Sequence, residues 1–366
     1  MKRILLVGMT GGIGGVETFI TNLLNRINRD EFKIDVLIFQ KVNGKYEDDL
    51  ENAYAVRHVH SFKKHPIRSF VDVFKLFRNN KYDIVHVNEC TAKLFVYCWP
   101  VLFQRKIKLI IHSHNGNGKS IFHRLINPIQ QLAASDRWSC SDEASRWMFG
   151  RNYKKKYNVV SVHNGIDVNE YLFSKKTREE YRDRFSITKG TWVIGCVARL
   201  EKQKNHLFLL DIFKELLVKN PKSLLVLVGN GSLESDITKK ARNIGVLNKV
   251  IFLGARSDVN CLLQMFDVLV MPSLFEGLPF SGIEAQAAGL PLVISKNVDH
   301  QIAITKNVNF EDLDDTAAQW AKNIETSLSA RLNKRMDYKI VNKDFIAQKY
   351  DLNDTVKKIE SLYESI

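Results

Sequence analysis

The sequence lacks several features that would place it in a specialised class of protein. Its 366 residues include only five cysteines, at positions 90, 98, 140, 196 and 261, and none of them forms a C-x-x-C pair. This spacing argues against a disulfide framework and against a zinc site, and it fits a reducing compartment. No segment is of low complexity, and no repeat of solenoid type recurs along the chain.

Long apolar runs are missing as well. The stretch LFVYCWPVLF (94–103) falls short of the ~20 apolar residues that a membrane-spanning helix needs. The N-terminal segment MKRILLVGMTGGIGG passes from a short apolar run into a glycine turn and a helical pattern, which is not typical of a signal peptide. We therefore expect a cytoplasmic protein.

Acidic residues are scarce in one half of the chain. Residues 1–166 carry 26 Lys and Arg but only 14 Asp and Glu, whereas the remainder carries 28 and 26. A basic half beside a nearly neutral half predicts that one domain meets an anionic surface. Because no nucleic-acid-binding motif accompanies the charge, we expect no nucleic acid partner and favour a membrane surface or lipid phosphate.

Short runs rich in Val, Ile and Leu alternate with amphipathic segments along almost the whole length. We expect strands at 3–8, 34–39, 83–88, 108–114, 137–141, 159–164, 193–198, 224–229, 250–254, 268–272 and 291–295. Apolar strands that alternate with helices predict parallel sheets covered on both faces. The length favours two domains. We expect an α/β protein of two doubly wound domains, with a linker near the charged stretch KKTREEYRDRF and a ligand-binding cleft between the domains.

Polar and glycine-rich segments follow several of these strands. The turn GMTGGIGGVE (8–17) would let a backbone approach phosphate closely, although a tight turn that needs glycine explains it equally. His112 and His114 alternate onto one face of a strand end, where His114 can donate to a sugar hydroxyl or phosphate. The alternative is a polar strand end satisfied by neighbouring backbone.

Two loops in the second half carry the residues with the clearest chemistry. In VARLEKQKN (197–205), Arg199 and Lys204 suit a diphosphate, unless this is only a solvated loop. In SLFEGLPFSGIEAQAAG (273–289), Ser281 and Glu284 fit a helix capping box. The same glutamate, at a helix N-terminus, could instead contact the hydroxyls of a phosphorylated ligand. The acids Asp312, Asp314 and Asp315 precede a helical pattern, so we assign them to a charged first turn and expect no metal.

Taken in order, these segments resemble family 4 of the retaining glycosyltransferases (glycosyltransferase group 1), which have the glycosyltransferase B (GT-B) architecture. The matching segments are GGIGGVE (11–17), HSHNG (112–116), HNGID (163–167), VARLEKQKN (197–205), VGNGSL (228–233), FLGARSDV (252–259) and PSLFEGLPFSGIEAQAAGLPLV (272–293). The last is the most specific, because it contains the pair of glutamates Glu276 and Glu284. The resemblance implies Rossmann-like domains over 1–165 and 166–345, which face a cleft. It also implies a C-terminal helix, about 346–366, that returns to the first domain.

The resemblance also implies roles for individual residues. Arg199 and Lys204 would bind the donor diphosphate, Glu284 the ribose, and Glu276 and His114 the donor sugar. Backbone amides around Phe280 and Ser281 would meet phosphate or sugar, Gly14 and Gly15 would let the N-terminal loop close, and Arg256 would lie near the base. The resemblance further implies a reaction that needs no metal and no bound cofactor.

The activity implied is transfer of a hexose or N-acetylhexosamine, with retention of configuration, from a nucleotide-diphosphate sugar, by default a UDP-sugar. The acceptor would be a glycan or a polyprenyl-diphosphate-linked sugar in the synthesis of capsule or exopolysaccharide. A catalytically silent subunit that binds nucleotide sugar is the alternative.

The segment FKKHPIRSFVDVFKLFRNNK (62–81) combines basic residues, among them Lys63, Lys64 and Arg68, with an apolar helical face of Phe70, Val73, Phe74 and Phe77. This pattern is typical of a helix that docks peripherally on anionic lipid at the inner face of the plasma membrane. A core helix with a solvated basic face fits the same pattern.

Overall fold

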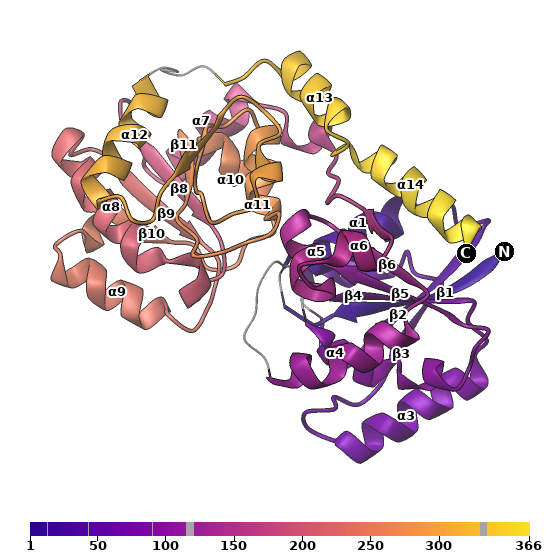
Figure 1. Cartoon of the computed structure of the whole chain (residues 1–366). Coiled ribbons are helices and arrows are strands. Elements are labelled where there is room, and N and C mark those ends of the chain that lie inside the picture. The colour runs from indigo at the N-terminus through magenta and orange to yellow at the C-terminus, as the bar shows by residue number, and fades with distance from the viewer. Residues whose placement is uncertain (13, 43, 90, 115–120, 330–334) are drawn as a thin grey trace. The chain divides into compact units, whose positions relative to one another are not determined.

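The structure is a computed structural model that describes residues 1–366 except 13, 43, 90, 115–120 and 330–334. The chain divides into two compact units, and each is described here by itself (Figure 1). Unit 1 comprises Met1–Gly165 together with Leu352–Ile366, and unit 2 comprises Ile166–Asp351. Each unit is a parallel sheet whose strands alternate with helices. The predicted α/β class with two Rossmann-like domains is confirmed.

Unit 1 contains a seven-stranded parallel sheet in the order β3-β2-β1-β4-β5-β6-β7. Its strands are β1 (Lys2–Met9), β2 (Phe32–Ile38), β3 (Ala55–His58), β4 (Ile84–Glu89), β5 (Lys108–Ser113), β6 (Asp136–Ser139) and β7 (Val159–Ser161). Its α-helices are α1 (Gly15–Arg26), α2 (Glu47–Leu50), α3 (Pro66–Asn79), α4 (Ile121–Ala133), α5 (Asp142–Phe149), α6 (Tyr153–Lys156) and α14 (Leu352–Ser365). Short 3-10 helices, η1 (Gly44–Tyr46), η2 (Ala92–Tyr97) and η3 (Trp99–Leu102), complete it.

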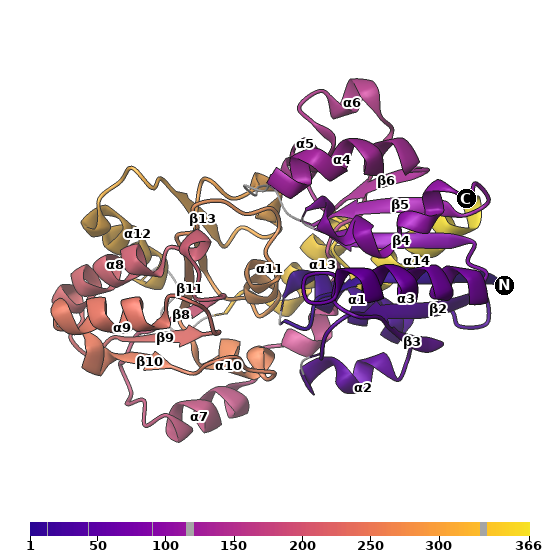
Figure 2. The ribbon, with the colours of Figure 1, turned by 90° about the horizontal axis from the view of Figure 1, so that it is seen from below.

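The core of unit 1 lies on both faces of this sheet, as alternation of apolar side chains along the strands requires. One apolar cluster joins strand residues such as Leu5 and Leu109 to Phe77 of α3, Phe95 of η2 and Met148 of α5, with α4 packed against it. Helices α3 and α4 therefore cover the same face of the sheet, together with η2 and η3 (Figures 1 and 2).

The other face of the sheet holds the C-terminal helix α14. The Nζ of Lys2 donates to the carbonyl oxygen of Tyr363 at 2.7 Å, and the amide of Asn28 donates to Oε1 of Glu360 at 2.7 Å. The hydroxyl of Tyr363 lies 2.6 Å from Nδ1 of His86 on β4. These contacts fix α14 to unit 1, whereas residues 346–351 belong to unit 2.

Unit 2 contains a six-stranded parallel sheet in the order β10-β9-β8-β11-β12-β13. Its strands are β8 (Val193–Val197), β9 (Leu224–Val228), β10 (Val250–Phe252), β11 (Val268–Met271), β12 (Leu292–Ser295) and β13 (Val308–Glu311). Its α-helices are α7 (Lys175–Arg184), α8 (His206–Lys219), α9 (Glu234–Asn243), α10 (Val259–Met265), α11 (Phe280–Ala287), α12 (Ala317–Ser329) and α13 (Tyr338–Ala347). The 3-10 helices are η4 (Val168–Tyr171), η5 (Lys202–Lys204), η6 (Leu247–Lys249) and η7 (His300–Ile302).

Each sheet has one point at which the order of its strands reverses. In unit 1 the reversal falls between β1 and β4, and in unit 2 between β8 and β11. In open parallel sheets, ligands bind outside the carboxyl ends of the strands at such a point. The loops after β1, β4, β8 and β11 are therefore where a binding site is expected in each unit.

The charged stretch after residue 174, near which we expected the linker, forms α7 of unit 2. Arg178 and Arg182 on this helix each reach one carboxylate oxygen of Asp267, at 2.5 and 2.6 Å.

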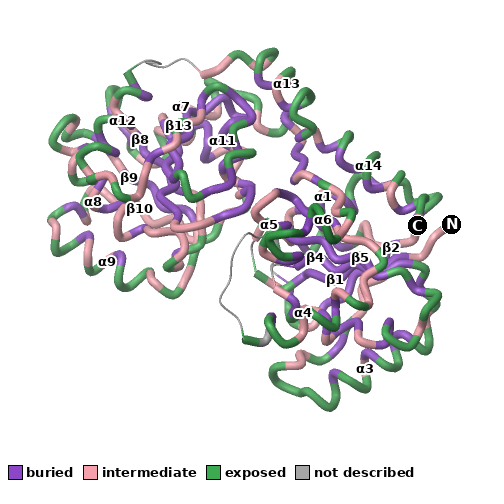
Figure 3. Tube along the Cα trace, viewed as in Figure 1, coloured by how far each residue is buried: buried purple, intermediate pink, exposed green. Residues whose placement is uncertain are grey.

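Figure 3 shows that the strands of each sheet are largely buried, whereas helices such as α7 and α3 are exposed on one side.

Candidate functional site

The strand reversal of unit 2 brings together two residues that the sequence places 72 positions apart. Lys204 ends η5 in the loop after β8, and Glu276 lies in the loop after β11. Their side chains form an ion pair between Nζ and Oε2, and both are largely buried, with exposed fractions of 13% and 7%. The other oxygen of Glu276 accepts from the hydroxyl of Ser273 at 2.5 Å. A buried cation and a buried anion therefore neutralise each other where a ligand is expected.

The same two loops are also joined through Gln203. Its side-chain amide donates to the carbonyl oxygen of Phe275 at 2.8 Å, and its own carbonyl oxygen accepts from the amide of Leu274 at 2.8 Å. Asn205, with a left-handed φ of 57°, then turns the chain into α8. These bonds hold η5 against the loop after β11, so the position of Lys204 does not depend on its ion pair alone.

Arg199 is positioned by the glycines of VGNGSL. A Cβ at Gly229 would lie 2.1 Å from the carbonyl oxygen of Ala198, and a Cβ at Gly231 would lie 2.3 Å from that of Leu200. Only glycine permits this approach, which is secured by a 2.9 Å bond from the Leu200 amide to the Asn230 carbonyl oxygen. Arg199 itself is exposed and makes no side-chain hydrogen bond within the described part of the chain. Its backbone is fixed and its guanidinium is available.

Helix α11 begins two residues earlier than a capping box at Ser281 and Glu284 requires, so that prediction is wrong. The N-cap is Pro279, with no side-chain cap, and Ser281 lies inside the first turn, where its hydroxyl contacts the sulfur of Met271 at 3.8 Å. Oε1 of Glu284 accepts a 3.0 Å hydrogen bond from the hydroxyl of Tyr171 on η4. Phe280 is buried at the first helical position. No motif in the sequence indicates Tyr171, which precedes Glu284 by 113 residues.

The side chain of Arg256 makes a structural contact with Asp258. Its Nε and Nη2 donate to the two oxygens of Asp258 at 2.8 and 2.6 Å, directly before α10. The hydroxyl of Tyr181 donates to the same carboxylate at 2.6 Å. The bond from Arg256 is the main cause that lowers the pKa of Asp258 to about 2. The side chain of Arg256 is thus held at the start of α10 rather than left available.

In unit 1, the glycine turn after β1 is closed by Glu17, which the sequence analysis did not single out. Gly14 is the extended N-cap of α1, and Gly15 is its first residue. Oε1 of Glu17 accepts from the amide and the hydroxyl of Thr10, at 3.2 and 2.5 Å. Glu17 therefore draws the turn onto the N-terminus of α1, at the strand reversal of unit 1.

His114 follows β5, close to the end of β4. Its Nε2 lies 3.0 Å from Oδ1 of Asn88, and its ring centroid lies 4.1 Å from that of His112. Nε2 of His86 in turn lies 3.3 Å from Nδ1 of His112. Burial lowers the pKa of His114 to about 3, so the imidazole is neutral near pH 7 and can offer a hydrogen bond but no charge.

Burial of these neutral histidines predicts a loss of stability in acid. Burial lowers the pKa values of His86 and His112 as well. Unfolded histidine binds its proton near pH 6.5, whereas folded His114 does so only near pH 3, so the unfolded state binds more protons in this window. We expect the free energy of unfolding to fall as pH drops below about 6.5, with His114 alone contributing roughly 1–2 kcal/mol by pH 5.

The measurement is the denaturation midpoint from pH 7 to pH 5 for His114→Asn and for the exposed control His65→Asn. The first variant should lose less stability than the wild type, and the control should follow the wild type. Equal slopes for all three proteins would contradict the prediction. The comparison of variants is needed because burial raises the pKa of Glu89 to about 8, which favours the folded state as pH falls.

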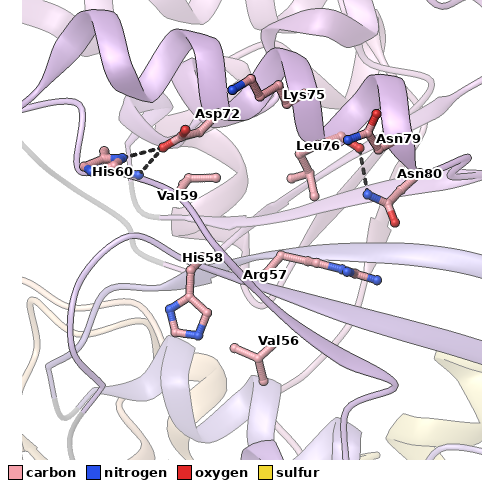
Figure 4. Close-up of a pocket in the computed structure, with 10 residues that line it drawn as sticks. All are labelled: Val56, Arg57, His58, Val59, His60, Asp72, Lys75, Leu76, Asn79 and Asn80. Carbon is pink, nitrogen blue, oxygen red and sulfur yellow. Dashed lines mark hydrogen bonds and ion pairs between the residues drawn. The ribbon is translucent and has the colours of Figure 1, made fainter.

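A separate hollow of about 580 Å³ lies between β3 and α3 in unit 1 (Figure 4). Asp72 on its α3 side is bonded to Nδ1 of His60 at 2.6 Å, and Nε of Arg57 donates to Asp35 at 2.7 Å. These charges are already paired, and the hollow contains none of the predicted site residues. We assign it no part in the chemistry.

The acids after β13 precede α12 and do not lie in its first turn, contrary to the prediction, and the side chain of Asp312 has two local partners. Oδ1 of Asp312 accepts from the amide of Asp314 at 3.1 Å, and Oδ2 lies 3.5 Å from Nζ of Lys296. Over the described residues, no group of three or more His, Cys, Asp or Glu side chains is arranged to hold a metal ion.

The two Rossmann-like units define the class of fold, which is the GT-B architecture. HepE of Anabaena, solved in complex with UDP and glucose, superposes with a TM-score of 0.82 at 19% identity, and the alignment covers 100% of both chains. Residues 177–344 match the family Glycosyl transferases group 1 and residues 13–170 match Glycosyltransferase Family 4, so both halves of the chain identify it as a glycosyltransferase.

Two relatives align with nearly the whole chain. EpsF of Bacillus subtilis (strain 168), which is named as a glycosyltransferase, is 29% identical over 378 residues, covering 99% of this chain and 96% of the relative. An Escherichia coli UDP-Gal:α-D-GlcNAc-diphosphoundecaprenol α-1,3-galactosyltransferase is 24% identical over 372 residues, with 93% of each chain covered.

Proposed function

We propose that the protein transfers a hexose or N-acetylhexosamine from a UDP-sugar to a glycan or lipid-linked acceptor in the synthesis of a surface polysaccharide. The observation that carries the proposal is the juxtaposition of Lys204, Glu276 and the exposed Arg199 at the strand reversal of unit 2. The relative from Escherichia coli supports the class of donor and acceptor, because its name specifies UDP-Gal and a diphosphoundecaprenol-linked sugar. The UDP bound in HepE supports the nucleotide.

The diphosphate of the donor is assigned to the two cations. Arg199 offers a planar fork of donors, and Lys204 offers a compact charge that Gln203 and its neighbours hold in place. Lys204 already faces a carboxylate, so binding of a diphosphate adds a second anion to a cation that is oriented beforehand. Because Ser273 also holds Glu276, this carboxylate keeps one hydrogen bond when Lys204 turns to the phosphate.

The remaining groups of unit 2 are assigned to the sugar and the ribose. Glu276 accepts hydrogen bonds from hydroxyls of the donor sugar, and Glu284 accepts from the ribose hydroxyls with Tyr171 holding it in position. The first amides of α11, around Phe280 and Ser281, are assigned to phosphate or sugar, because the N-terminus of a helix favours anions.

Transfer with retention requires that the new bond form on the face from which the leaving group departs. In the proposed step, the bond between the anomeric carbon and the phosphate oxygen breaks, and a bond from that carbon to the acceptor oxygen forms on the same face. The acceptor's proton passes to the departing diphosphate. Arg199 and Lys204 stabilise the charge that develops on this leaving group, so the proposal needs neither a metal nor a bound cofactor.

Titration with nucleotide sugars tests the donor assignment. We expect UDP-sugars to raise the melting temperature by several degrees at ligand concentrations far above Kd, because ligand bound only to the folded state stabilises it. GDP- and ADP-sugars should have smaller effects. Glu284→Ala should weaken binding roughly tenfold, which corresponds to the loss of a charge-assisted hydrogen bond.

The matched control is Glu234→Ala, which removes an exposed glutamate from the first turn of another helix of unit 2, α9. Tyr171→Phe should weaken binding less than Glu284→Ala, since it removes only the group that orients the carboxylate. If no nucleotide series stabilises the protein, or if Glu284→Ala binds UDP as the wild type does, the donor assignment is wrong.

A further inference from the structure

Helix α4 presents an apolar stripe to solvent. Its most exposed apolar side chains are Ile121, Leu125, Ile129 and Leu132, which are 81, 65, 44 and 88% exposed. They are spaced by four, four and three residues, so they share one side of the helix. The opposite side carries the buried Gln130, which donates to Glu89 on β4. A helix on the surface of a soluble domain normally has the reverse distribution, with its apolar stripe toward the core.

Helix α3 has a second apolar stripe on its outer side. Ile67, Phe70, Val71 and Phe74 are exposed, whereas Val73 and Phe77 are buried in the core of unit 1. The apolar face predicted from the sequence therefore divides into two parts, one that packs on the sheet and one that faces outward. The helix is a core helix, which is one of the two interpretations of this segment, and it also exposes aromatic side chains.

The two stripes belong to one face of unit 1. Helices α3 and α4 pack on either side of η2, over the same face of the sheet (Figures 1 and 2). Phe70 lies 5.7 Å from Trp99 between ring centroids, and Trp99 lies 6.1 Å from Phe103, which is 78% exposed at the end of η3. Of the seventeen large apolar side chains that are exposed in the described residues, ten lie on α3, on α4 or at Leu102 and Phe103. We call this the α3–α4 surface.

Basic side chains surround the α3–α4 surface, and the segments that form it contain almost no acidic residues. The segments 61–81, 91–108 and 121–133 contain eleven Lys and Arg but one acid, Asp72, which is bonded to His60. All eleven basic side chains are exposed, and none forms an ion pair among those that the structure describes. They are Lys63, Lys64, Arg68, Lys75, Arg78, Lys81, Lys93, Arg105, Lys106, Lys108 and Arg124. The surface thus combines exposed aromatic and aliphatic groups with one sign of charge.

We propose that the α3–α4 surface docks on an anionic phospholipid bilayer. The apolar stripes enter the headgroup region, and the surrounding Lys and Arg contact lipid phosphates, which is how basic amphipathic helices lie in an interface. A symmetric contact with a second copy would bring eleven cations against eleven, which does not suit a stable dimer. The inference concerns a surface of unit 1 and does not depend on the donor assignment made for unit 2.

Cosedimentation of the full chain with vesicles tests the inference. We expect binding to vesicles of equimolar phosphatidylglycerol and phosphatidylethanolamine, much weaker binding to pure phosphatidylcholine, and a decrease as salt is added. The triple variant Lys63→Glu/Lys64→Glu/Arg68→Glu should bind the anionic vesicles at least 100-fold more weakly, since each basic residue contributes about tenfold or less near the surface. Leu125→Ser/Ile129→Ser should also lose binding, although it keeps every charge.

Two control variants make the same kinds of substitution, charge reversal and removal of apolar side chains, on the surface of unit 2. Lys214→Glu/Lys219→Glu/Lys222→Glu reverses three exposed charges on and after α8, and Val218→Ser/Ile340→Ser removes two exposed apolar side chains. Both should bind vesicles as the wild type does. A nucleotide-induced thermal shift that is retained in every variant shows that the fold of unit 2 is intact, so loss of vesicle binding is distinguishable from loss of donor binding.

Three outcomes would overturn the inference. The wild type does not bind anionic vesicles, or the α3 and α4 variants bind them unchanged. In the third outcome, the wild type does not bind vesicles but forms dimers, and Leu125→Ser/Ile129→Ser abolishes these dimers. This face would then be an interface between two copies of the chain.

Discussion

Lys204→Ala is expected to lower turnover by roughly 10²–10³-fold, which is the cost of removing one preoriented group that stabilises developing charge in a transition state. The loss should appear in kcat more than in KM, since the charge on the departing diphosphate grows along the reaction. Lys204→Arg should recover little, because a guanidinium does not fit the position of the ammonium between η5 and Glu276. Steady-state kinetics with a UDP-sugar and an acceptor measure the effect.

Stability must be separated from catalysis in this experiment, because Lys204→Ala leaves the buried Glu276 side chain with Ser273 as its one polar partner among the residues that the structure describes. An unpaired buried charge costs about 3–5 kcal/mol. The double variant Lys204→Ala/Glu276→Gln removes that charge and should regain stability without regaining activity. Lys202→Ala is the matched control, since it removes an exposed lysine from the same 3-10 turn. Wild-type turnover in Lys204→Ala would disprove the phosphate role.

Gly229→Ala is expected to destabilise unit 2 by more than about 3 kcal/mol and to abolish most activity. The residue combines a φ of 138° with a Cβ position 2.1 Å from the carbonyl oxygen of Ala198, so an alanine must push away the backbone that carries Arg199. Gly231→Ala meets the Leu200 backbone at 2.3 Å without a positive φ, and its effect is purely steric. Equilibrium unfolding and donor binding both report the displacement.

The control for Gly229 is Gly245→Ala in the same unit. Gly245 has a φ of 78°, but an added Cβ would meet nothing within 4 Å, so the variant carries backbone strain alone. We expect it to cost about 1–2 kcal/mol and to leave donor binding intact. If Gly229→Ala and Gly245→Ala were equally stable, the close approach to Ala198 would not be what requires glycine in VGNGSL.

The two strands that the sequence analysis missed both lie at a sheet edge, where two of the predicted strands, β7 and β10, lie as well. All eleven predicted strands are present, and most are interior strands whose apolar runs follow from burial on both faces. The two missed strands, β3 (AVRH) and β13 (VNFE), are edge strands of four residues. An edge strand has one open side and needs no continuous apolar run, so it leaves little trace in the pattern.

In the candidate site, the loops could be predicted from the sequence, but the contacts that their residues make could not. The loops carrying Arg199, Lys204, Glu276 and Glu284 were predictable because they follow apolar strands and contain a distinctive succession of glycine, proline and charge. Their partners were not predictable. Tyr171 reaches Glu284 across 113 residues, and nothing in the sequence around it indicates the contact.

The capping box was wrong for a related reason. Local spacing fits Ser281 as a cap, but Pro279 takes the N-cap position and Glu284 bonds to Tyr171 of another element. Likewise, the charged stretch that we placed near the linker forms α7, and two of its arginines bond to Asp267. Local pattern describes what a segment can do, and tertiary contacts select among those options.

By itself, the sequence determined the α/β class, the two-domain organisation and the identity of the charged loops, because burial patterns and strand-end motifs are local properties of the chain. Only the tertiary structure decided which charges meet and which side chains remain exposed. In the tertiary structure, Lys204 pairs with Glu276, and Arg256 bonds to Asp258. One apolar stripe of α3 faces outward beside an exposed stripe of α4. These outcomes depend on the order of strands in each sheet, which places loops distant in sequence next to one another.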